Sequence, residues 1–200
     1  MPRSRKKGGR WQDHYAIRAK KENYPARSVY KLKEIQQRYR LISAGDRILD
    51  LGCAPGSWLQ LAAELTGKSG NVIGVDLKPV TVKLPPQAVA YTGNILEDDP
   101  ELERHLDLPF DVVISDMAPA TTGHRDVDAA RSLQLCEAAL AIAQRRLRTG
   151  GRFLCKIFQG SDSQEFTDAV KQVFNVQKAY KPQSSRKASK EIFIIGIDKI

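Results

Sequence analysis

Residues 47–66, RILDLGCAPGSWLQLAAELT, join an apolar strand pattern, a glycine-rich turn and a helical pattern. Apolar residues at 48, 49 and 51 lead up to Gly52, and residues 56–66 carry apolar side chains at helical spacing. Glycine in a turn between a strand and a helix allows a ligand to approach the backbone closely. We therefore predict that this stretch is the first strand and helix of an α/β sheet, with a ligand bound at the turn.

The alternation of strand and helix patterns continues along the rest of the chain. Further strands are expected at 71–77, 88–94, 110–116, 151–158, 176–182 and 191–198, and helices at 28–39, 125–148 and 162–174. Ser28 is expected to cap the first of these helices, and Gly150 and Gly151 to end the second. Strands separated by helices indicate parallel βαβ units, whereas the polar connection before the last strand indicates an antiparallel pair. The predicted fold class is α/β: a doubly wound, mostly parallel seven-stranded sheet with helices on both faces and an antiparallel last strand.

The length of 200 residues suits one domain, and the formal net charge is +9. Residues 1–40 carry 13 Lys and Arg against three Asp and Glu, and residues 178–200 carry six against two, whereas 41–177 have a net charge of −5. Basic ends of this kind suit the phosphate backbone of a nucleic acid. We expect a basic, partly disordered N-terminal extension over 1–24 and a single domain over 25–200. A solubilising tail is an equal alternative for 1–10, while the aromatic residues among the charges at 11–40, Trp11 among them, favour an ordered basic face.

Several other classes of protein are disfavoured by the composition. The apolar runs are too short to span a bilayer, and the basic N-terminus leads into no apolar signal segment, so we expect a cytoplasmic protein without a membrane partner. The three cysteines form no CxxC pair and lie in apolar segments, as buried thiols in a reducing compartment do. His14, His105 and His124 are spread along the chain at no metal-ligand spacing, so surface positions and no metal are expected. A monomer is expected.

Charged residues stand at the carboxyl ends of several predicted strands. Asp50 lies in the first, Asp76 and Asp116 end the second and fourth, and Lys156 lies near the end of the fifth. A lysine in a strand buried on both faces costs roughly several kcal/mol unless it is compensated. Any one such residue is more often a solvated strand end, but open α/β sheets bind ligands at this edge, and four together favour a site. An antiparallel last strand would bring its first residue, Glu191, to the same edge.

The turn DLGCAPGSW, residues 50–58, favours a ligand that contains adenosine but no diphosphate. It departs from the G-x-G-x-x-G pattern of dinucleotide sites, because Gly52 and Gly56 are four residues apart and Pro55 lacks a backbone amide. Asp76 follows at the end of the next strand, where a carboxylate accepts hydrogen bonds from ribose hydroxyls. S-adenosylmethionine fits this description.

Six segments resemble the motif set of the FtsJ/RrmJ-type (RlmE) family of ribosomal RNA 2′-O-methyltransferases. They occur in the family's order and are SVYKLKEI (28–35), DLGCAPGSW (50–58), GVDL (74–77), SDMAP (115–119), KIFQG (156–160) and SSRKASKEIFII (184–195). The resemblance implies the Rossmann-like fold of S-adenosylmethionine-dependent methyltransferases. The cofactor contacts that it implies are Gly52, Gly56, Trp58, Asp76, Asn94 and Asp116. Members commonly have an acidic residue near the adenine, whereas this chain has Asn94, which can still accept a hydrogen bond from the adenine amino group.

The resemblance also implies a Lys-Asp-Lys-Glu tetrad, here Lys31, Asp116, Lys156 and Glu191, for methyl transfer to a ribose 2′-hydroxyl. A hydroxyl is a poor nucleophile at neutral pH, so a positioned base helps, and Lys156 is the candidate. Burial and the second lysine favour a neutral amine, whereas the two carboxylates stabilise the ammonium. Lys156 as a base and Lys156 as a positioning group for in-line attack are therefore both open. Spacing alone would leave Lys31 and Glu191 as ordinary surface charges.

The resemblance implies that the substrate is a uridine of 23S rRNA, modified in the large (50S) ribosomal subunit. Transfer RNA is an alternative substrate, because related members act on it. A non-catalytic RNA-binding assembly factor is a second alternative, which the intact tetrad disfavours. A nicotinamide-dependent oxidoreductase is disfavoured by Pro55 and the short chain, and a methyltransferase for small molecules or proteins by the basic ends.

Overall fold

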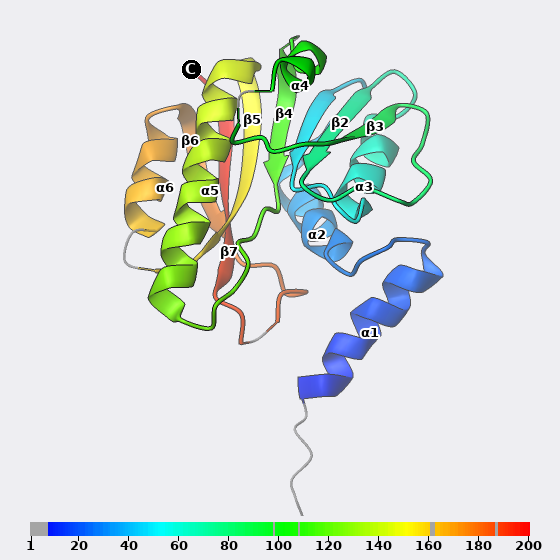
Figure 1. The fold of residues 1–200 in the computed structure, drawn as a ribbon, viewed down its shortest axis with the longest axis vertical. Helices are drawn as coiled ribbons and strands as arrows, with labels where there is room; N and C mark the ends of the chain where they lie inside the picture. Colours follow the sequence, from blue (N-terminus) through cyan, green and yellow to red (C-terminus); the bar gives the residue numbers. More distant parts are fainter. Residues whose placement is uncertain (1–7, 98, 108, 161–162, 187) are drawn as a thin grey trace, which may run out of the picture.

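The computed structural model describes residues 8–97, 99–107, 109–160, 163–186 and 188–200, with the side chains from residue 14 onward (Figure 1). The expectations for residues 1–7 and for the side chain of Trp11 lie outside this description. The helices are α1 (Gly8–Lys21), α2 (Val29–Tyr39), α3 (Ser57–Thr66), α4 (Pro100–His105), α5 (Arg125–Arg146) and α6 (Ser163–Lys171). The strands are β1 (Arg47–Leu51), β2 (Asn71–Asp76), β3 (Ala88–Thr92), β4 (Phe110–Ser115), β5 (Leu147–Phe158), β6 (Phe174–Tyr180) and β7 (Glu191–Lys199).

The strands form one seven-stranded sheet in the order β3-β2-β1-β4-β5-β7-β6. Strand β7 pairs antiparallel with both β5 and β6, and the other pairs are parallel, which confirms the predicted fold class. Glu191, the first residue of β7, pairs with Phe158, the last residue of β5. The carboxyl ends of the parallel strands and the start of β7 therefore share one edge of the sheet, the lower one in Figure 1.

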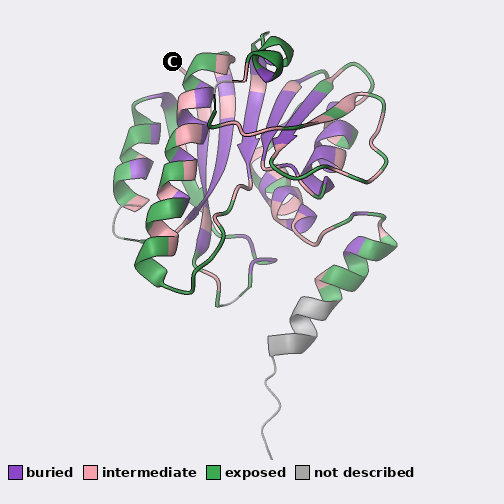
Figure 2. Ribbon diagram, viewed as in Figure 1, coloured by how far each residue is buried: buried purple, intermediate pink, exposed green. Residues whose placement is uncertain are grey.

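Each face of the sheet buries its own hydrophobic core beneath helices (Figure 2). One core joins Phe153, Cys155 and Ile157 of β5 to residues of α5 and α6, and the other joins Leu154 to residues of α2 and α3. Side chains alternate between the faces of a strand, so Lys156 belongs to the face of Leu154, the side that α2 covers. Strands β1, β2 and β4 have almost continuous apolar runs because both of their faces are buried, whereas β3 and β6 are only partly buried.

The end of α5 differs from the sequence-based prediction. The helix stops at Arg146, and Gly150 and Gly151 lie inside β5 rather than ending the helix. The buried Leu147 already pairs with Phe110, and the register then shifts before Arg152 pairs with Val112. Gly150 has φ +78° in this irregular segment. The glycines were mistaken for a helix end because the same left-handed conformation serves helix ends and strand irregularities.

The beginning of α2 also differs in detail from the prediction. The helix starts after Ser28 as expected, but Ser28 has helical angles and its hydroxyl makes no capping hydrogen bond. Its carbonyl oxygen instead accepts a hydrogen bond from Nε1 of Trp58 at 2.9 Å. This contact ties the start of α2 to α3 but does not act as a cap, because a cap accepts hydrogen bonds from the N–H groups of the first turn.

Helix α1 lies within the segment that the sequence assigned to a basic extension. It projects from the lower edge of the molecule in Figure 1, and Ala19 near its end is buried. The guanidinium of Arg18 lies 4.8 Å from the centre of the Tyr30 ring on α2. Just beyond the helix, the Tyr24 hydroxyl donates to Glu64 of α3 at 2.6 Å. Helix α4 was not predicted either, and α6 ends at Lys171, three residues earlier than expected, because Phe174 begins β6.

Candidate active site

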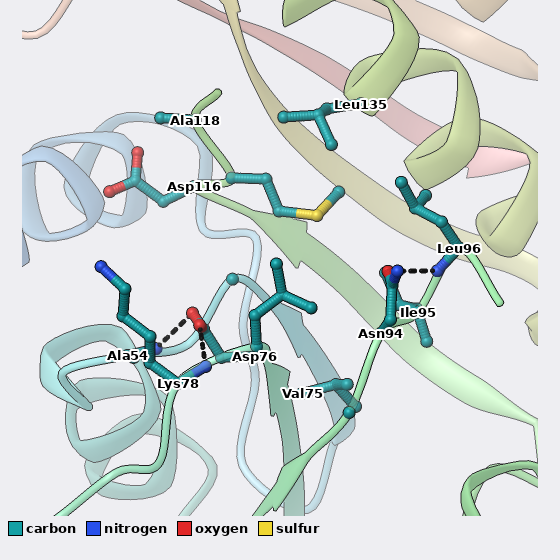
Figure 3. Close-up of a pocket in the computed structure, with 14 residues that line it drawn as sticks. Ala54, Val75, Asp76, Lys78, Asn94, Ile95, Leu96, Asp116, Ala118 and Leu135 are labelled. Carbon is teal, nitrogen blue, oxygen red and sulfur yellow. Dashed lines mark hydrogen bonds between the residues drawn. The ribbon is translucent and has the colours of Figure 1, made fainter. Parts of the chain in front are cut away.

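A cavity of about 310 Å³ opens at the carboxyl edge of β1, β2, β3 and β4 (Figure 3). Its lining comprises Gly52, Ala54, Val75, Asp76, Leu77, Lys78, Gly93, Asn94, Ile95, Leu96, Asp116, Met117, Ala118 and Leu135. Its volume lies at the lower end of the range for small-molecule and cofactor sites, about 300–1,000 Å³. Of the six residues predicted to contact a cofactor, the structure brings Gly52, Asp76, Asn94 and Asp116 to this wall. We name it the first cavity.

Gly52 leaves β1 in a conformation that only glycine adopts without strain. Its φ is +78°, and an added Cβ would lie 2.8 Å from the Met117 side chain and 3.0 Å from Met117 backbone atoms. Its amide donates to the carbonyl oxygen of Val75 at 2.8 Å. The turn therefore lies flat against the neighbouring strands and leaves the first cavity open.

The carboxylate of Asp76 is held in place by two backbone amides (Figure 3). Its Oδ2 accepts from the amide of Ala54 at 2.9 Å, and its Oδ1 accepts from the amide of Lys78 at 2.8 Å. An ionised carboxylate offers about four acceptor sites, so Asp76 keeps acceptor capacity toward the cavity. The predicted position of a ribose-binding carboxylate at the end of the second strand agrees with this geometry.

Asn94 lines the first cavity but is engaged in its own loop. Its side-chain amide donates to Glu97 at 2.6 Å, and its side-chain oxygen accepts from the amide of Leu96 at 3.1 Å. The amide oxygen is an acceptor with two lone pairs, so one contact to a ligand amino group is still available.

Gly56 and Trp58 are not among the residues that line either cavity described here. Gly56 has φ +109°, and a Cβ there would meet Val80 and Val82. Trp58 is 3% exposed and packs against Phe193 with ring centres 5.8 Å apart. The structure thus places Trp58 in the core between α3 and the sheet.

A second cavity, of about 280 Å³, lies beside the first, and Ala118 lines both. Its lining comprises Arg27, Ser28, Lys31, Ala118, Lys156, Phe158, Arg186, Ser189 and Glu191. Three of the four predicted tetrad residues are in this wall, and the fourth, Asp116, is in the wall of the first cavity. We name it the second cavity.

The predicted tetrad forms two ion pairs at the junction of the two cavities. Nζ of Lys31 lies 2.8 Å from Oε2 of Glu191, although the two residues are 160 positions apart in the sequence. Nζ of Lys156 lies 2.9 Å from Oδ1 of Asp116 but at an angle unsuited to a hydrogen bond, and it donates to the Asp116 carbonyl oxygen at 2.6 Å. Lys156 is 6% exposed. The buried lysine is thus compensated by charge and by a hydrogen bond.

The backbone of Lys156 is fixed from the opposite face of the sheet. Its carbonyl oxygen accepts from Sγ of Cys136 on α5 at 3.1 Å. All three cysteines are buried and free, as expected from their apolar surroundings. His14, His105 and His124 are exposed, also as expected.

Burial and charge act against each other on Glu191. Burial raises the pKa of a carboxyl group, but the ion pair with Lys31 and the charge of Lys156 outweigh it and lower the pKa of Glu191. The carboxylate is therefore held in its ionised form beside the two lysines.

Asp50 is a buried carboxyl group whose oxygens are not hydrogen-bonded to the other residues of the site. It is 0% exposed, and neither of its oxygens has a hydrogen-bond partner among the described residues. Burial, followed by the charges of Asp116 and Asp76, raises the pKa of Asp50 well above its usual value. Its position behind the turn explains this, because β1 is covered on both sides by neighbouring strands.

The sequence did not single out several residues of the two cavities. Phe158 was within the KIFQG motif, two positions after Lys156, and alternation along the strand would have placed both side chains on one face. Arg27 carried no signal beyond membership of a basic segment, and Arg186 lay within the motif at 184–195 without being singled out. In the part of the chain that the structure describes, no three His, Cys, Asp or Glu residues cluster in a way that could hold a metal ion. None of the described helices is long and apolar enough to cross a membrane.

The parallel sheet, its glycine turn and a cavity at the carboxyl edge define a Rossmann-type α/β protein. The chain belongs to the FtsJ-like methyltransferase family, whose model matches residues 24–199. It is therefore a methyltransferase, and S-adenosylmethionine is the methyl donor that this family uses in general.

Relatives and solved structures agree with this assignment. The chain is 57% identical over 197 residues to "Ribosomal RNA large subunit methyltransferase E" of Desulforapulum autotrophicum, with 98% of this chain and 97% of that protein covered. It is 49% identical over 199 residues to the protein of the same name in Desulfosudis oleivorans, with 100% and 96% covered. A crystal structure described as a ribosomal RNA methyltransferase of Plasmodium falciparum superposes with a TM-score of 0.78 at 27% identity, over 88% of this chain and 98% of that one.

Proposed function

We propose that this chain transfers the methyl group of S-adenosylmethionine to a ribose 2′-hydroxyl of large-subunit ribosomal RNA, and that the target is a uridine of 23S rRNA within the 50S particle. The observation that carries the proposal is the junction of the two cavities. The first cavity has the size and polar groups for the cofactor, and the second, beside it, holds both lysines of the tetrad. The names of the relatives support ribosomal RNA as the substrate.

The residues of the first cavity fit the cofactor in their chemistry. Asp76 would accept hydrogen bonds from the ribose hydroxyls, and Asn94 would meet the adenine amino group. The turn at Gly52 would leave room for the amino acid part. When bound, S-adenosylmethionine supplies an electrophilic methyl group on a sulfonium. Gly56 and Trp58 would support this site by packing rather than by contact.

The tetrad would hold the target hydroxyl in the second cavity. Lys156 touches the hydroxyl, and Asp116 fixes the direction of its Nζ through the carboxylate and the carbonyl oxygen. The Lys31–Glu191 ion pair lines the other side of the second cavity, and its two charges cancel, so it adds no net charge near Lys156. Because these groups are preorganised, holding the hydroxyl in line with the methyl group accounts for a large part of the rate. In its neutral form, Lys156 would also accept the proton of the hydroxyl as a general base.

The RNA backbone would follow the basic surface around the second cavity. Arg27 and Arg186 line the cavity itself, and Lys181 and Lys190 stand in the polar segment that leads to β7. Helix α1 projects from the same edge of the molecule (Figure 1). Guanidinium groups suit phosphates, and a 2′-hydroxyl target requires RNA rather than DNA. We propose that the protein acts as a cytoplasmic monomer whose single methyltransferase domain spans 25–200.

Labelled methyl transfer tests this function. Wild-type protein and Lys156→Ala are incubated with labelled S-adenosylmethionine and, separately, with hypomethylated large subunits, free rRNA and tRNA. We expect label in a 2′-O-methyl group of the large-subunit RNA, and a loss of about 10²–10⁴-fold in rate for Lys156→Ala. Cofactor affinity, measured by calorimetry, should be unchanged in the variant.

Lys171→Ala is the matched control, because Lys171 is an exposed lysine of α6 whose only described ion pair is with Asp168. It should transfer methyl groups at the wild-type rate. A fully active Lys156→Ala would remove Lys156 from the mechanism. Label on tRNA alone would favour the tRNA alternative, and no label on any RNA would favour the non-catalytic RNA-binding alternative.

A further inference from the structure

We propose that the ring of Phe158 is a stacking platform for the base of the nucleotide whose ribose is methylated. This inference rests on the proposed function, because it needs an RNA nucleotide in the second cavity. Phe158 would be a positioning residue that contacts the base of the nucleotide, whereas the tetrad contacts its ribose.

The place of Phe158 in the strand suits this role. It is the last residue of β5 and lies two positions after Lys156, so both side chains leave the same face of the sheet, about 7 Å apart along the strand. Leu154, two positions earlier on this face, is fully buried in the core that α2 covers. Along this face of β5, Leu154 therefore lies in the core, the buried Lys156 comes next, and the ring of Phe158 follows in the wall of the second cavity.

The packing of Phe158 sets it apart from the other phenylalanines of the chain. Phe110, Phe153, Phe166, Phe174 and Phe193 are all fully buried, whereas Phe158 is only partly buried and belongs to neither hydrophobic core. Its ring forms no aromatic pair with the described residues. Core packing therefore does not account for an apolar ring in a wall that also contains Arg27, Lys31 and Arg186.

The backbone around Phe158 is held firmly, although its ring is partly free. Its amide donates to Oγ of Ser132 on α5 at 3.1 Å, and the next amide, of Gln159, donates to the carbonyl oxygen of Lys190 at 2.9 Å. Strand pairing with Glu191 fixes the other side. A ring on a fixed backbone loses little further freedom when a base stacks on it, which favours binding.

The chemistry of the wall suits a nucleotide. Aromatic rings stack on bases, with an effect on affinity of about 5- to 150-fold per base, while arginine side chains bind the flanking phosphates. Every base has a π-face, so stacking on Phe158 would position the nucleotide without identifying it. The choice of the target nucleotide must then come from other contacts or from the shape of the RNA.

Substitutions that remove or keep the ring test the inference. Phe158→Leu and Phe158→Met remove it, and Phe158→Tyr keeps it. Methyl transfer is measured on the RNA that the wild-type protein modifies, with KM for RNA, kcat and the dissociation constant of S-adenosylmethionine determined separately. We expect Phe158→Leu and Phe158→Met to raise KM for RNA by at least about 10-fold, which is about 1.4 kcal/mol. Phe158→Tyr should stay near the wild-type value, and cofactor affinity should not change in any variant.

Tyr39→Leu is the control for the loss of a surface aromatic ring. Tyr39 ends α2, about 12 Å along the helix axis from Lys31, and packs against Tyr180. Its substitution should leave KM for RNA unchanged. Phe158→Leu or Phe158→Met with wild-type KM would overturn the inference, as would an equal loss in Phe158→Tyr. A wild-type protein that modifies no RNA would instead overturn the proposed function. Phe158→Met keeps the test valid if the leucine variant loses its fold, which cofactor binding reveals.

Discussion

Two buried carboxyl groups near the carboxyl edge of the sheet respond to their surroundings in opposite ways. The pKa of Asp50 is raised by burial and by two neighbouring aspartates, and the pKa of Glu191 is lowered because two lysines outweigh its burial. Both residues are less than 9% exposed. Asp50 is the more deeply buried of the two and has two carboxylates as charged neighbours, whereas Glu191 lies beside two lysines. Depth and charged partners together set the direction of each shift, and neither can be read from the sequence alone.

Asp50 should make the protein less stable as the pH rises. Its pKa in the unfolded chain is near 3.8, and its pKa in the folded protein is higher, so above about pH 4 the folded state holds a proton that the unfolded state releases. The free energy of unfolding should therefore fall with pH by up to about 1.4 kcal/mol per pH unit until the folded pKa is reached. Asp50→Asn, which does not ionise, should lack this contribution. Urea unfolding of both proteins from about pH 5 to about pH 8 measures it, and parallel curves would contradict the prediction.

Glu191 should have the opposite effect. Its pKa in the folded state lies below the unfolded value of 4.5, so the stability that it contributes is fully present above that value and is lost as the pH falls through the folded pKa. On acidification from about pH 6 to about pH 3, wild-type protein should lose more unfolding free energy than Glu191→Gln. Urea unfolding of both proteins from about pH 6 to about pH 3 tests this. An equal loss in both proteins would show that the ion pair with Lys31 adds no pH-dependent stability.

At the scale of elements, the turn between β1 and α3 requires glycine at position 52, because a side chain there would be strained and would meet Met117. Gly52→Ala should destabilise the protein by more than the roughly 1–3 kcal/mol of a left-handed alanine, because the new Cβ also meets the Met117 backbone. The turn would move into the first cavity, so cofactor affinity should fall as well. Thermal unfolding and calorimetry measure the two effects.

Gly67→Ala is the matched control for that substitution. Gly67 has φ +70° and ψ −170°, a conformation that is also specific to glycine, but an added Cβ there would meet nothing within 4 Å. It should therefore show the conformational strain alone and keep full cofactor affinity. Equal losses of stability and affinity in the two variants would show that contact with Met117 does not matter.

The elements that the sequence predicted well are those with a strong apolar pattern. Strands β1, β2 and β4 have nearly continuous apolar runs because both of their faces are covered, and α3 has a clear inward stripe. Helix α1 was not predicted, because its sequence is strongly basic and part of it packs through Ala19 and through cations on aromatic rings. The end of α5 was misplaced because Gly150 has the conformation typical of a helix end. Local sequence patterns thus predict the elements that bury an apolar face. They fail for elements whose position or ends are set by tertiary contacts.

At the scale of the whole molecule, the sheet order assembles a site from distant parts of the chain. Strand β7 lies between β5 and β6, which carries Glu191 to the end of β5 beside Lys156, and α2 crosses the same edge with Lys31. The charged strand ends predicted this edge from the pattern alone, whereas the pairing of Lys31 with Glu191 needed the family resemblance. Arg27 and Phe158 were not predicted, because their place in the second cavity depends on how α2, β5 and the segment before β7 pack together.

The charge distribution of the whole molecule predicts how RNA binding should respond to salt. The net charge of +9 arises from the two basic ends, while the middle of the chain is acidic, and three of the basic residues of these ends, Arg27, Lys31 and Arg186, line the second cavity. Each cation that neutralises a phosphate adds about 0.7–0.9 to the slope of log affinity against log salt concentration. RNA affinity should therefore fall steeply between low and physiological salt, while affinity for S-adenosylmethionine changes little.

Arg186→Gln should reduce the slope for RNA by about 1, because Arg186 lines the second cavity and makes no ion pair within the part of the chain that the structure describes. Lys171→Gln, on the surface of α6, should leave the slope unchanged. Fluorescence titrations with labelled RNA at several salt concentrations measure these slopes, and an RNA affinity independent of salt would exclude the basic ends as the phosphate-binding surface.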